Sequence, residues 1–168
     1  MRKVIGIGET VLDIIFKDGK PIEAVPGGST FNGIVSLGRA GLNVTFMSET
    51  GNDRVGEYVR HFLEDNNVDA SNINVYPETK SPISLAFLDK DNNADYIFYR
   101  DVPHDHIDFT YPDIQPDDIV VFGSFYAVNP ALRPQVAGLL DYARQRGAII
   151  YYDVNFRPAH RNDVMKIT

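Results

Sequence analysis

Residues 26–41 read PGGSTFNGIVSLGRAG, and this stretch decides the class of the fold. Gly27 and Gly28 break a β-rich opening, and Gly41 ends the helix that follows them. Paired glycines between a strand and a helix let the backbone pass close to a ligand and present amide groups at a positive helix end. Taken alone, such a pair followed by Asn32 is more often a turn than a ligand site. The residues after the glycines that keep the spacing of one helix face are Phe31, Ile34, Val35 and Gly38.

On both sides of this stretch, the apolar pattern alternates between strands and helices. Residues 17–20 predict a hairpin turn near the start of the chain. Asn52 or Asp53 is the expected cap of a second helix that ends near Asn66. A third helix runs to Gly147 and starts near Arg133, or one turn earlier at Asn129-Pro130. The expected strands lie at 4–7, 11–16, 22–25, 44–48, 73–76, 83–89, 94–100, 119–122 and 148–152.

These elements predict an α/β layer with a smaller β subdomain. The uninterrupted apolar runs at 119–122 and 149–152 are typical of strands that are covered on both faces. The strands at 83–89 and 94–100 are joined by a short polar turn, so we expect them to be antiparallel and partly exposed. We therefore predict one domain without repeats or linkers, with the small subdomain formed by residues 11–25 and 72–100.

Composition and charge exclude several classes of function. The 168 residues contain no cysteine, which excludes disulfides and cysteine-ligated metals and favours a cytoplasmic protein. No apolar run approaches the ~18 residues of a membrane span. Of the 23 acidic residues, nine lie between Asp89 and Asp118 with only two basic ones, and the remaining chain balances at 14 against 14. We read this run as a solvated acidic loop, and we expect neither nucleic acid nor membrane as a partner of this acidic chain.

The sequence lacks a complete copy of three motifs that would indicate other kinds of site. Gly6 and Gly8 could begin a dinucleotide-binding fingerprint, but Val11 occupies the position of its third glycine. No phosphate-binding loop of the type G-x-x-x-x-G-K-[ST] occurs in the sequence. His104 and His106 could bind a metal, but no third ligand follows at a recognisable spacing, so an ordinary polar loop is favoured.

The glycine pattern, together with three other segments, resembles a known family. Gly27-Gly28, Asn32, Gly41 and Gly51 keep the spacing of the first signature of ribokinase-type (PfkB family) carbohydrate kinases. Thr30 and Ile34 depart from that signature at positions that favour small residues. The chain resembles the N-terminal half of such a kinase over residues 4–158. The other similar segments are Gly8-Glu9 with Asp13, residues 50–56 and residues 153–158.

The resemblance implies a ribokinase-like fold with a doubly wound, mainly parallel sheet and a small β-sheet lid. It also implies transfer of a phosphoryl group from ATP, with Mg²⁺, to a sugar hydroxyl. Asp13 would accept hydrogen bonds from the sugar, and Tyr99 and Arg100 would reach it from the lid. The residues implied on the other edge of the sugar are Gly27, Gly28 and Asn32, and those implied near substrate or phosphates are Asp153, Asn155 and Arg157.

The residues alone leave other interpretations open for these positions. Asp13 has the position of an ordinary aspartate at a strand end or turn. The alternation of residues 96–100 suits a lid closed on a sugar and equally an exposed hairpin with an apolar inner face. Asp153, Asn155 and Arg157 could belong to a capped turn after the last strand.

The sequence has no match to the Gly-Ala-Gly-Asp-like segment that carries the catalytic base in this family. We therefore expect no catalytic residue in this chain, which would supply the sugar-binding half of a kinase. Fructose is the first substrate hypothesis, and 2-keto-3-deoxygluconate is the alternative. A non-catalytic sugar-binding or interaction module is the contrasting hypothesis, and a homodimer through the lid is expected as a partner.

Overall fold

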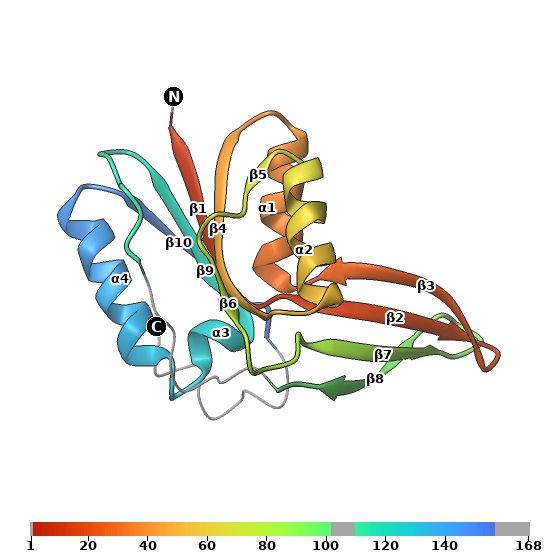
Figure 1. Ribbon diagram of the computed structural model, residues 1–168. Helices are drawn as coiled ribbons and strands as arrows, with labels where there is room; N and C mark the ends of the chain where they lie inside the picture. Colours follow the sequence, from red (N-terminus) through yellow and green to blue (C-terminus); the bar gives the residue numbers. More distant parts are fainter. Residues whose placement is uncertain (1, 102–109, 157–168) are drawn as a thin grey trace.

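The computed structural model describes residues 2–101 and 110–156, which form two sheets and four helices (Figure 1). The main sheet has the strand order β10-β9-β1-β4-β5, and β6 pairs with β4 beyond β5. Every pairing in it is parallel. No helix in the described part of the chain is long and apolar enough to cross a membrane. The strands of this sheet are β1 (Lys3–Ile7), β4 (Asn43–Gly51), β5 (Val68–Asp69), β6 (Ile73–Tyr76), β9 (Ile119–Gly123) and β10 (Ile149–Asp153).

Helices cover both faces of the main sheet, as expected for a doubly wound fold. Helices α1 (Ser29–Arg39) and α2 (Arg54–Asp65) lie on one face, and α4 (Arg133–Gln145) lies on the other (Figure 1). Successive side chains of a strand point to opposite faces, so β1 contributes Val4 to the first layer and Ile5 to the second. Residues 4–7 of the strand are therefore all apolar, because each face contacts its own core.

Four further strands form a separate mixed sheet, which we call the lid. Its strand order is β3-β2-β7-β8. Strand β2 is antiparallel to β3 and parallel to β7, and β7 is antiparallel to β8. Asp18 and Gly19 both have positive φ in the turn between β2 and β3, which is the backbone of a tight two-residue hairpin. The lid extends away from the main sheet on the side of α1 and α2 (Figure 1). Its strands are β2 (Val11–Lys17), β3 (Lys20–Gly27), β7 (Ile83–Leu88) and β8 (Ala94–Tyr99).

Strand β6 does not belong to the lid, which corrects the subdomain boundary expected at residue 72. The nine-residue β4 extends past the two-residue β5, and β6 pairs in parallel with the end that β5 does not reach, from Ser48 to Gly51. The lid strands in the second segment therefore begin at Ile83. The apolar pattern of a short strand did not indicate which sheet it would join.

Strand β10 is also less buried than its sequence indicates. Ile149, Ile150 and Tyr151 are 46%, 36% and 60% exposed, although the run was expected to be covered on both faces. The reason is its position, because β10 is the edge strand of the described sheet and pairs with β9. An additional short helix, α3 (Ser124–Val128), follows β9, and α4 begins at Arg133 as expected.

The expected cap of α2 is confirmed and also joins the helix to the segment that leads into the lid. The Gly56 amide donates to Asp53 Oδ1 at 2.9 Å. The Ser81 amide donates to Oδ2 at 2.8 Å, and the Ser81 hydroxyl donates to Oδ1 at 2.7 Å. Burial acts to raise the pKa of Asp53, but hydrogen bonds from Ser81, Gly56 and Val55 outweigh it and hold this pKa below its ordinary value of 3.8.

Asp53→Ala is expected to lower the free energy of unfolding by about 1–2 kcal/mol at neutral pH, because the cap and the contacts with Ser81 are lost. The folded-state pKa lies below the unfolded one, so this stabilisation is present above about pH 4 and disappears as the pH falls through the folded-state pKa. Urea unfolding of the complete protein measures the difference. Asp65→Ala, at the exposed last residue of α2, is the matched control. An equal loss for Asp53→Ala in strong acid and at neutral pH would contradict the prediction.

Candidate functional site

The candidate site lies where the carboxyl ends of the main strands meet the base of the lid. Glu9 follows β1, Glu49 lies near the end of β4, Ser124 follows β9, and Asp153 ends β10. Ligands of open parallel sheets bind at this edge, because the loops after the strands leave a crevice there. The lid strand β2 starts from the same edge at Val11.

Asp13 and Gly27 come together at the base of the lid. Asp13 lies opposite Ser84 in the pairing of β2 with β7, and the Ser84 hydroxyl donates to Asp13 Oδ1. A Cβ atom placed on Gly27 would lie 2.9 Å from Asp13 Oδ2, so any larger residue would crowd this carboxylate oxygen. Burial raises the pKa of Asp13 above its ordinary value of 3.8, and the Ser84 hydrogen bond offsets part of that increase.

Gly28 lies at the junction between the lid and α1. Its φ of 138° falls where side chains are disfavoured, and a Cβ atom there would lie 2.3 Å from the Glu9 carbonyl oxygen. It is the N-terminal cap residue of α1, and Asn32 is exposed in the first turn of this helix. The Asn32 amide donates to the Gly28 carbonyl at 3.0 Å. The two residues therefore lie at the positive end of α1, as the sequence predicted.

The end of β10 reaches the same helix end. The Ser29 hydroxyl donates to Asp153 Oδ2 at 3.2 Å, which connects α1 to the main sheet edge. The Asn155 amide donates to Asp153 Oδ1 at 3.2 Å, and its side-chain Nδ2 donates to the Ser124 hydroxyl at 3.2 Å. Ser124 and Asn155 have positive φ values of 55° and 34°, a backbone strain that is concentrated at functional sites.

Tyr99 is not brought to the Asp13 carboxylate. Ser84 is paired with Phe98 across β7 and β8, so Asp13, Ser84 and Phe98 share one face of the lid. Tyr99 is the next residue, and its side chain is directed to the opposite face. The structure thus separates two residues that the sequence analysis placed at the same sugar, and a sugar contact by Tyr99 stays a prediction.

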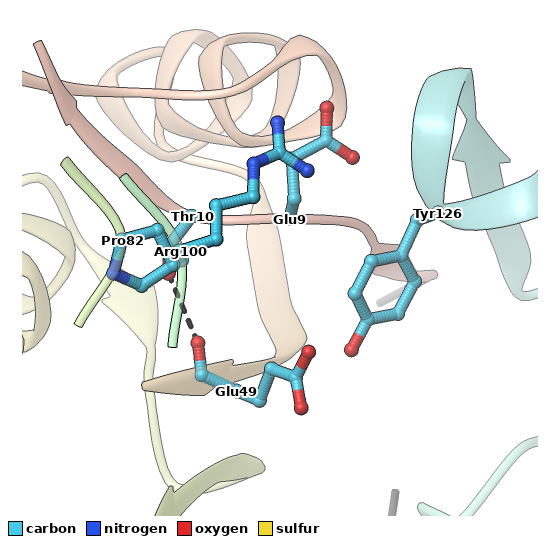
Figure 2. A pocket seen from close by; sticks show the side chains of 6 residues that line it. All are labelled: Glu9, Thr10, Glu49, Pro82, Arg100 and Tyr126. Carbon is cyan, nitrogen blue, oxygen red and sulfur yellow. Dashed lines mark hydrogen bonds between the residues drawn. The ribbon is translucent and has the colours of Figure 1, made fainter. Parts of the chain in front are cut away.

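Arg100 lies at the junction between the lid and the main sheet. Its guanidinium carbon lies 5.0 Å from the centre of the Phe98 ring, so it is on the Asp13 side of the lid. Its side chain lines a small pocket between the lid and the main sheet (Figure 2). Desolvation lowers the pKa of Arg100, and the negative charge of Glu9 opposes this change. The residues that line the pocket are Glu9, Thr10, Glu49, Pro82, Arg100 and Tyr126.

Sequence reasoning missed Ser124, Glu49 and Tyr126. Ser124 directly follows a buried parallel strand, and the rule that ligands bind at the carboxyl ends of strands could have found it. Glu49 is an acidic residue in an otherwise buried strand and is 3% exposed, which is an unusual place for a carboxylate. No local signal in the sequence indicates Tyr126. His104, His106 and Arg157 lie outside the described residues.

The comparison with known families decides the family. The family described as "pfkB family carbohydrate kinase" matches residues 1–167. The chain belongs to the pfkB family of carbohydrate kinases. The resemblance found in the glycine spacing is therefore confirmed, and so is the ribokinase-like fold class.

The similar members of the pfkB family are named for different kinase activities. "5-dehydro-2-deoxygluconokinase 2" of Bacillus cereus is 27% identical over 174 residues, which covers 92% of this chain and 50% of that protein. "Fructokinase-1" of Oryza sativa subsp. japonica is 23% identical and covers 93% of this chain and 52% of that protein. The chain spans about half the length of the curated relatives that it matches.

A solved structure agrees with the fold of the chain. The structure of the sugar kinase PH1459 from Pyrococcus horikoshii in complex with ATP is 28% identical and has a TM-score of 0.81. The comparison covers 98% of this chain and 57% of that one. The described residues of the chain hold no group of three or more acidic or histidine side chains placed to bind a metal ion.

Proposed function

We propose that the complete protein carrying this chain transfers the γ-phosphoryl group of ATP to a hydroxyl of a small sugar, and that this chain supplies the sugar-binding half. The observation that supports the proposal most strongly is the Asp13 carboxylate at the base of the lid. Ser84 donates to one of its oxygens, and Gly27 leaves the other without a crowding side chain. An ionised carboxylate accepts hydrogen bonds at both oxygens, so the second is suited to a sugar hydroxyl.

The N-terminus of α1 supports the other edge of the sugar. Gly28 would let the backbone come close to a sugar, and the first amides of the helix have no partner within it. The exposed Asn32 side chain both donates and accepts, which suits a hydroxyl group. Asp153 and Asn155 are held nearby through Ser29 and Ser124 and would align the acceptor. A sugar without one of these hydroxyls would leave one of these polar groups without its hydrogen bond in the closed site, which is the proposed basis of selectivity.

ATP and Mg²⁺ belong to the proposal through the family. ATP supplies the phosphoryl group, and Mg²⁺ neutralises charge on the phosphates during transfer. We place the catalytic base outside this chain, which lacks the segment that carries it in the family. The chain's own residues bind and orient the sugar. We also propose a cytoplasmic location, on the basis of the cysteine-free sequence.

Fructose is the preferred substrate in this proposal, and an acid sugar such as 2-keto-3-deoxygluconate is the alternative. A sugar acid requires a cation for its carboxylate. Arg100 already faces the negative charge of Glu9 in the pocket, which makes it less suited to a second carboxylate. Because the chain is similar to a 5-dehydro-2-deoxygluconokinase, acid sugars are also included among the substrates to be tested.

A substrate panel tests this proposal. Fructose, 2-keto-3-deoxygluconate and 5-dehydro-2-deoxygluconate are offered to the complete protein with ATP and Mg²⁺, and ADP release is followed. We expect kcat/KM for fructose to exceed that for either acid by about tenfold or more. Preference for an acid sugar would move the assignment to that class. Sugar binding without turnover would support the non-catalytic module, and neither binding nor turnover would refute the proposal.

The exposed lid favours a homodimer. Strand β8 presents large apolar side chains on both faces, and Ile97 is 46% exposed. We expect Ile97→Asp to shift the complete protein from dimer to monomer in sedimentation experiments, because a charge would be buried in the contact. Leu42→Asp, at a similarly exposed apolar position outside the lid, is the control and should leave the mass unchanged. A wild-type protein that sediments as a monomer would contradict this prediction.

A further inference from the structure

Glu9 connects the sugar-binding edge of the core to the lid. Its backbone packs against Gly28, whose missing Cβ would lie 2.3 Å from the Glu9 carbonyl oxygen. Its side chain lines the pocket between the lid and the main sheet (Figure 2). The same residue thus contacts the N-terminal end of α1 through its backbone and faces the lid through its carboxylate.

Arg100 is the lid residue that faces Glu9. It directly follows β8, and its guanidinium group stacks beside Phe98 at 5.0 Å from the ring centre. Figure 2 shows the guanidinium group directed toward the Glu9 carboxylate. The two opposite charges attract each other across the junction.

The other groups on the core side of the pocket are buried. The Thr10 hydroxyl donates to the Glu49 carbonyl at 3.0 Å, which holds the segment after β1 to the end of β4. Glu49 and Tyr126 are 3% and 1% exposed. Among the described residues, the Tyr126 hydroxyl has no hydrogen-bond partner, and burial together with nearby negative charge raises its pKa well above 10, so it keeps its proton. Within the part of the chain that the structure describes, the titratable groups that line this pocket together with Arg100 are Glu9, Glu49 and Tyr126.

The proposed site combines residues of the lid with residues of the core, so it depends on how these two parts are aligned. Asp13 belongs to lid strand β2, whereas Gly28 caps a helix of the core. Both must reach the same sugar, and a displacement of about 1 Å between them would weaken both sets of contacts. An attachment between the lid and the core at Arg100 would limit that displacement.

We propose that Glu9 is a positioning residue that holds Arg100 and thereby fixes the lid relative to the N-terminus of α1. Arg100 then serves mainly as the lid's attachment to the core and not as a direct sugar ligand. This inference rests on the proposed function for its effect on the sugar, but the attachment itself can be measured without any substrate.

The first test is hydrogen exchange in the complete protein without sugar or nucleotide. Glu9→Gln keeps the side-chain shape and removes the charge, and amide exchange of residues 94–99 should become about tenfold faster, because the lid opens more often. Glu23→Gln, at an exposed lid position on β3, is the matched control and should leave this exchange unchanged. Arg100→Gln should reproduce the effect if Glu9→Gln fails to fold. Unchanged exchange of residues 94–99 in a folded variant would overturn the proposal.

The second test is kinetic and uses the sugar selected by the panel. Glu9→Gln should raise KM for the sugar about tenfold while kcat changes less than about twofold, and Arg100→Gln should do the same. The double variant should be no worse than the more affected single variant, and Glu9→Asp should recover part of the loss. Effects that multiply in the double variant would show independent roles and overturn the pairing. A protein that phosphorylates no sugar would refute the proposed function, and the exchange measurement would still decide whether Glu9 holds the lid.

Discussion

Replacing Asp13 with alanine is expected to weaken sugar binding to the complete protein by about 100-fold or more. The carboxylate is half-buried at the base of the lid, where Ser84 fixes one of its oxygens and Gly27 leaves room beside the other. Its loss would leave a sugar hydroxyl without an acceptor and the Ser84 hydroxyl without its partner. Calorimetric titration of the sugar in the absence of nucleotide measures the affinity directly.

A control variant shows whether the effect of Asp13→Ala comes from the site itself or from the loss of one negative charge on the lid. Asp95→Ala removes an exposed aspartate of another lid strand, β8, and should leave the sugar affinity unchanged. Asp13→Ala that folds normally and binds the sugar as tightly as the wild type would remove Asp13 from the site.

The pH dependence of binding provides an independent check on Asp13. Burial raises its pKa above the ordinary 3.8, so the charged form is lost at a higher pH than for an exposed aspartate. We expect sugar affinity to be complete near neutral pH and to fall as the pH decreases through this raised pKa. Asp13→Asn should bind weakly at every pH and show no such decrease. A wild-type affinity that stays constant through the acidic range would contradict a role for the ionised carboxylate.

Gly28→Ala is expected to reduce the free energy of unfolding by about 3 kcal/mol or more and to abolish sugar binding. Two separate costs produce this effect. The backbone has a φ of 138°, which disfavours any side chain, and the new Cβ would lie 2.3 Å from the Glu9 carbonyl oxygen. Relief of this contact would move the end of α1 away from the residues that follow β1. Urea unfolding and calorimetry measure the two consequences.

Gly33→Ala is the control for this substitution, because it lies in the same helix with no atom within 4 Å of an added Cβ. Alanine favours helix over glycine, so this variant should be more stable than the wild type by about 0.5–1 kcal/mol. If the Gly28→Ala protein were as stable as the Gly33→Ala protein, the junction between the lid and α1 would tolerate a side chain. The close approach of Gly28 to Glu9 would then not constrain the site.

Local patterns in the sequence predicted most of the fold. The spacing of Phe31, Ile34 and Val35 predicted α1, and Asp53 was an expected cap of α2. The turn at Asp18-Gly19 predicted the first hairpin of the lid. These features depend on neighbouring residues, whose preferences are contained in a short stretch of chain. The glycine spacing and the segments at each end also indicated the family, which the comparison confirmed.

The errors concern partners that lie far apart along the chain. Nothing within residues 73–76 shows that β4 extends beyond β5 and offers its edge to β6. The apolar run of β10 reads as buried, but exposure is determined by its place at the edge of the described sheet.

The candidate site shows the same division. The sequence analysis predicted Asp13, Gly27 and Gly28 as site residues, and in the structure they lie around the base of the lid. The family resemblance grouped Tyr99 with Arg100, whereas the pairing of β7 with β8 directs Tyr99 away from the Asp13 face of the lid. Tyr126 reaches the pocket from a short helix that the apolar pattern did not predict.

A crystal structure of the complete protein with the sugar selected by the substrate panel tests the central claim most directly. We expect a sugar hydroxyl to lie within hydrogen-bonding distance of the Asp13 carboxylate, and we expect the sugar to contact the backbone at Gly27 and Gly28. A sugar bound elsewhere, with Asp13 bonded to Ser84 and distant from the ligand, would contradict the claim.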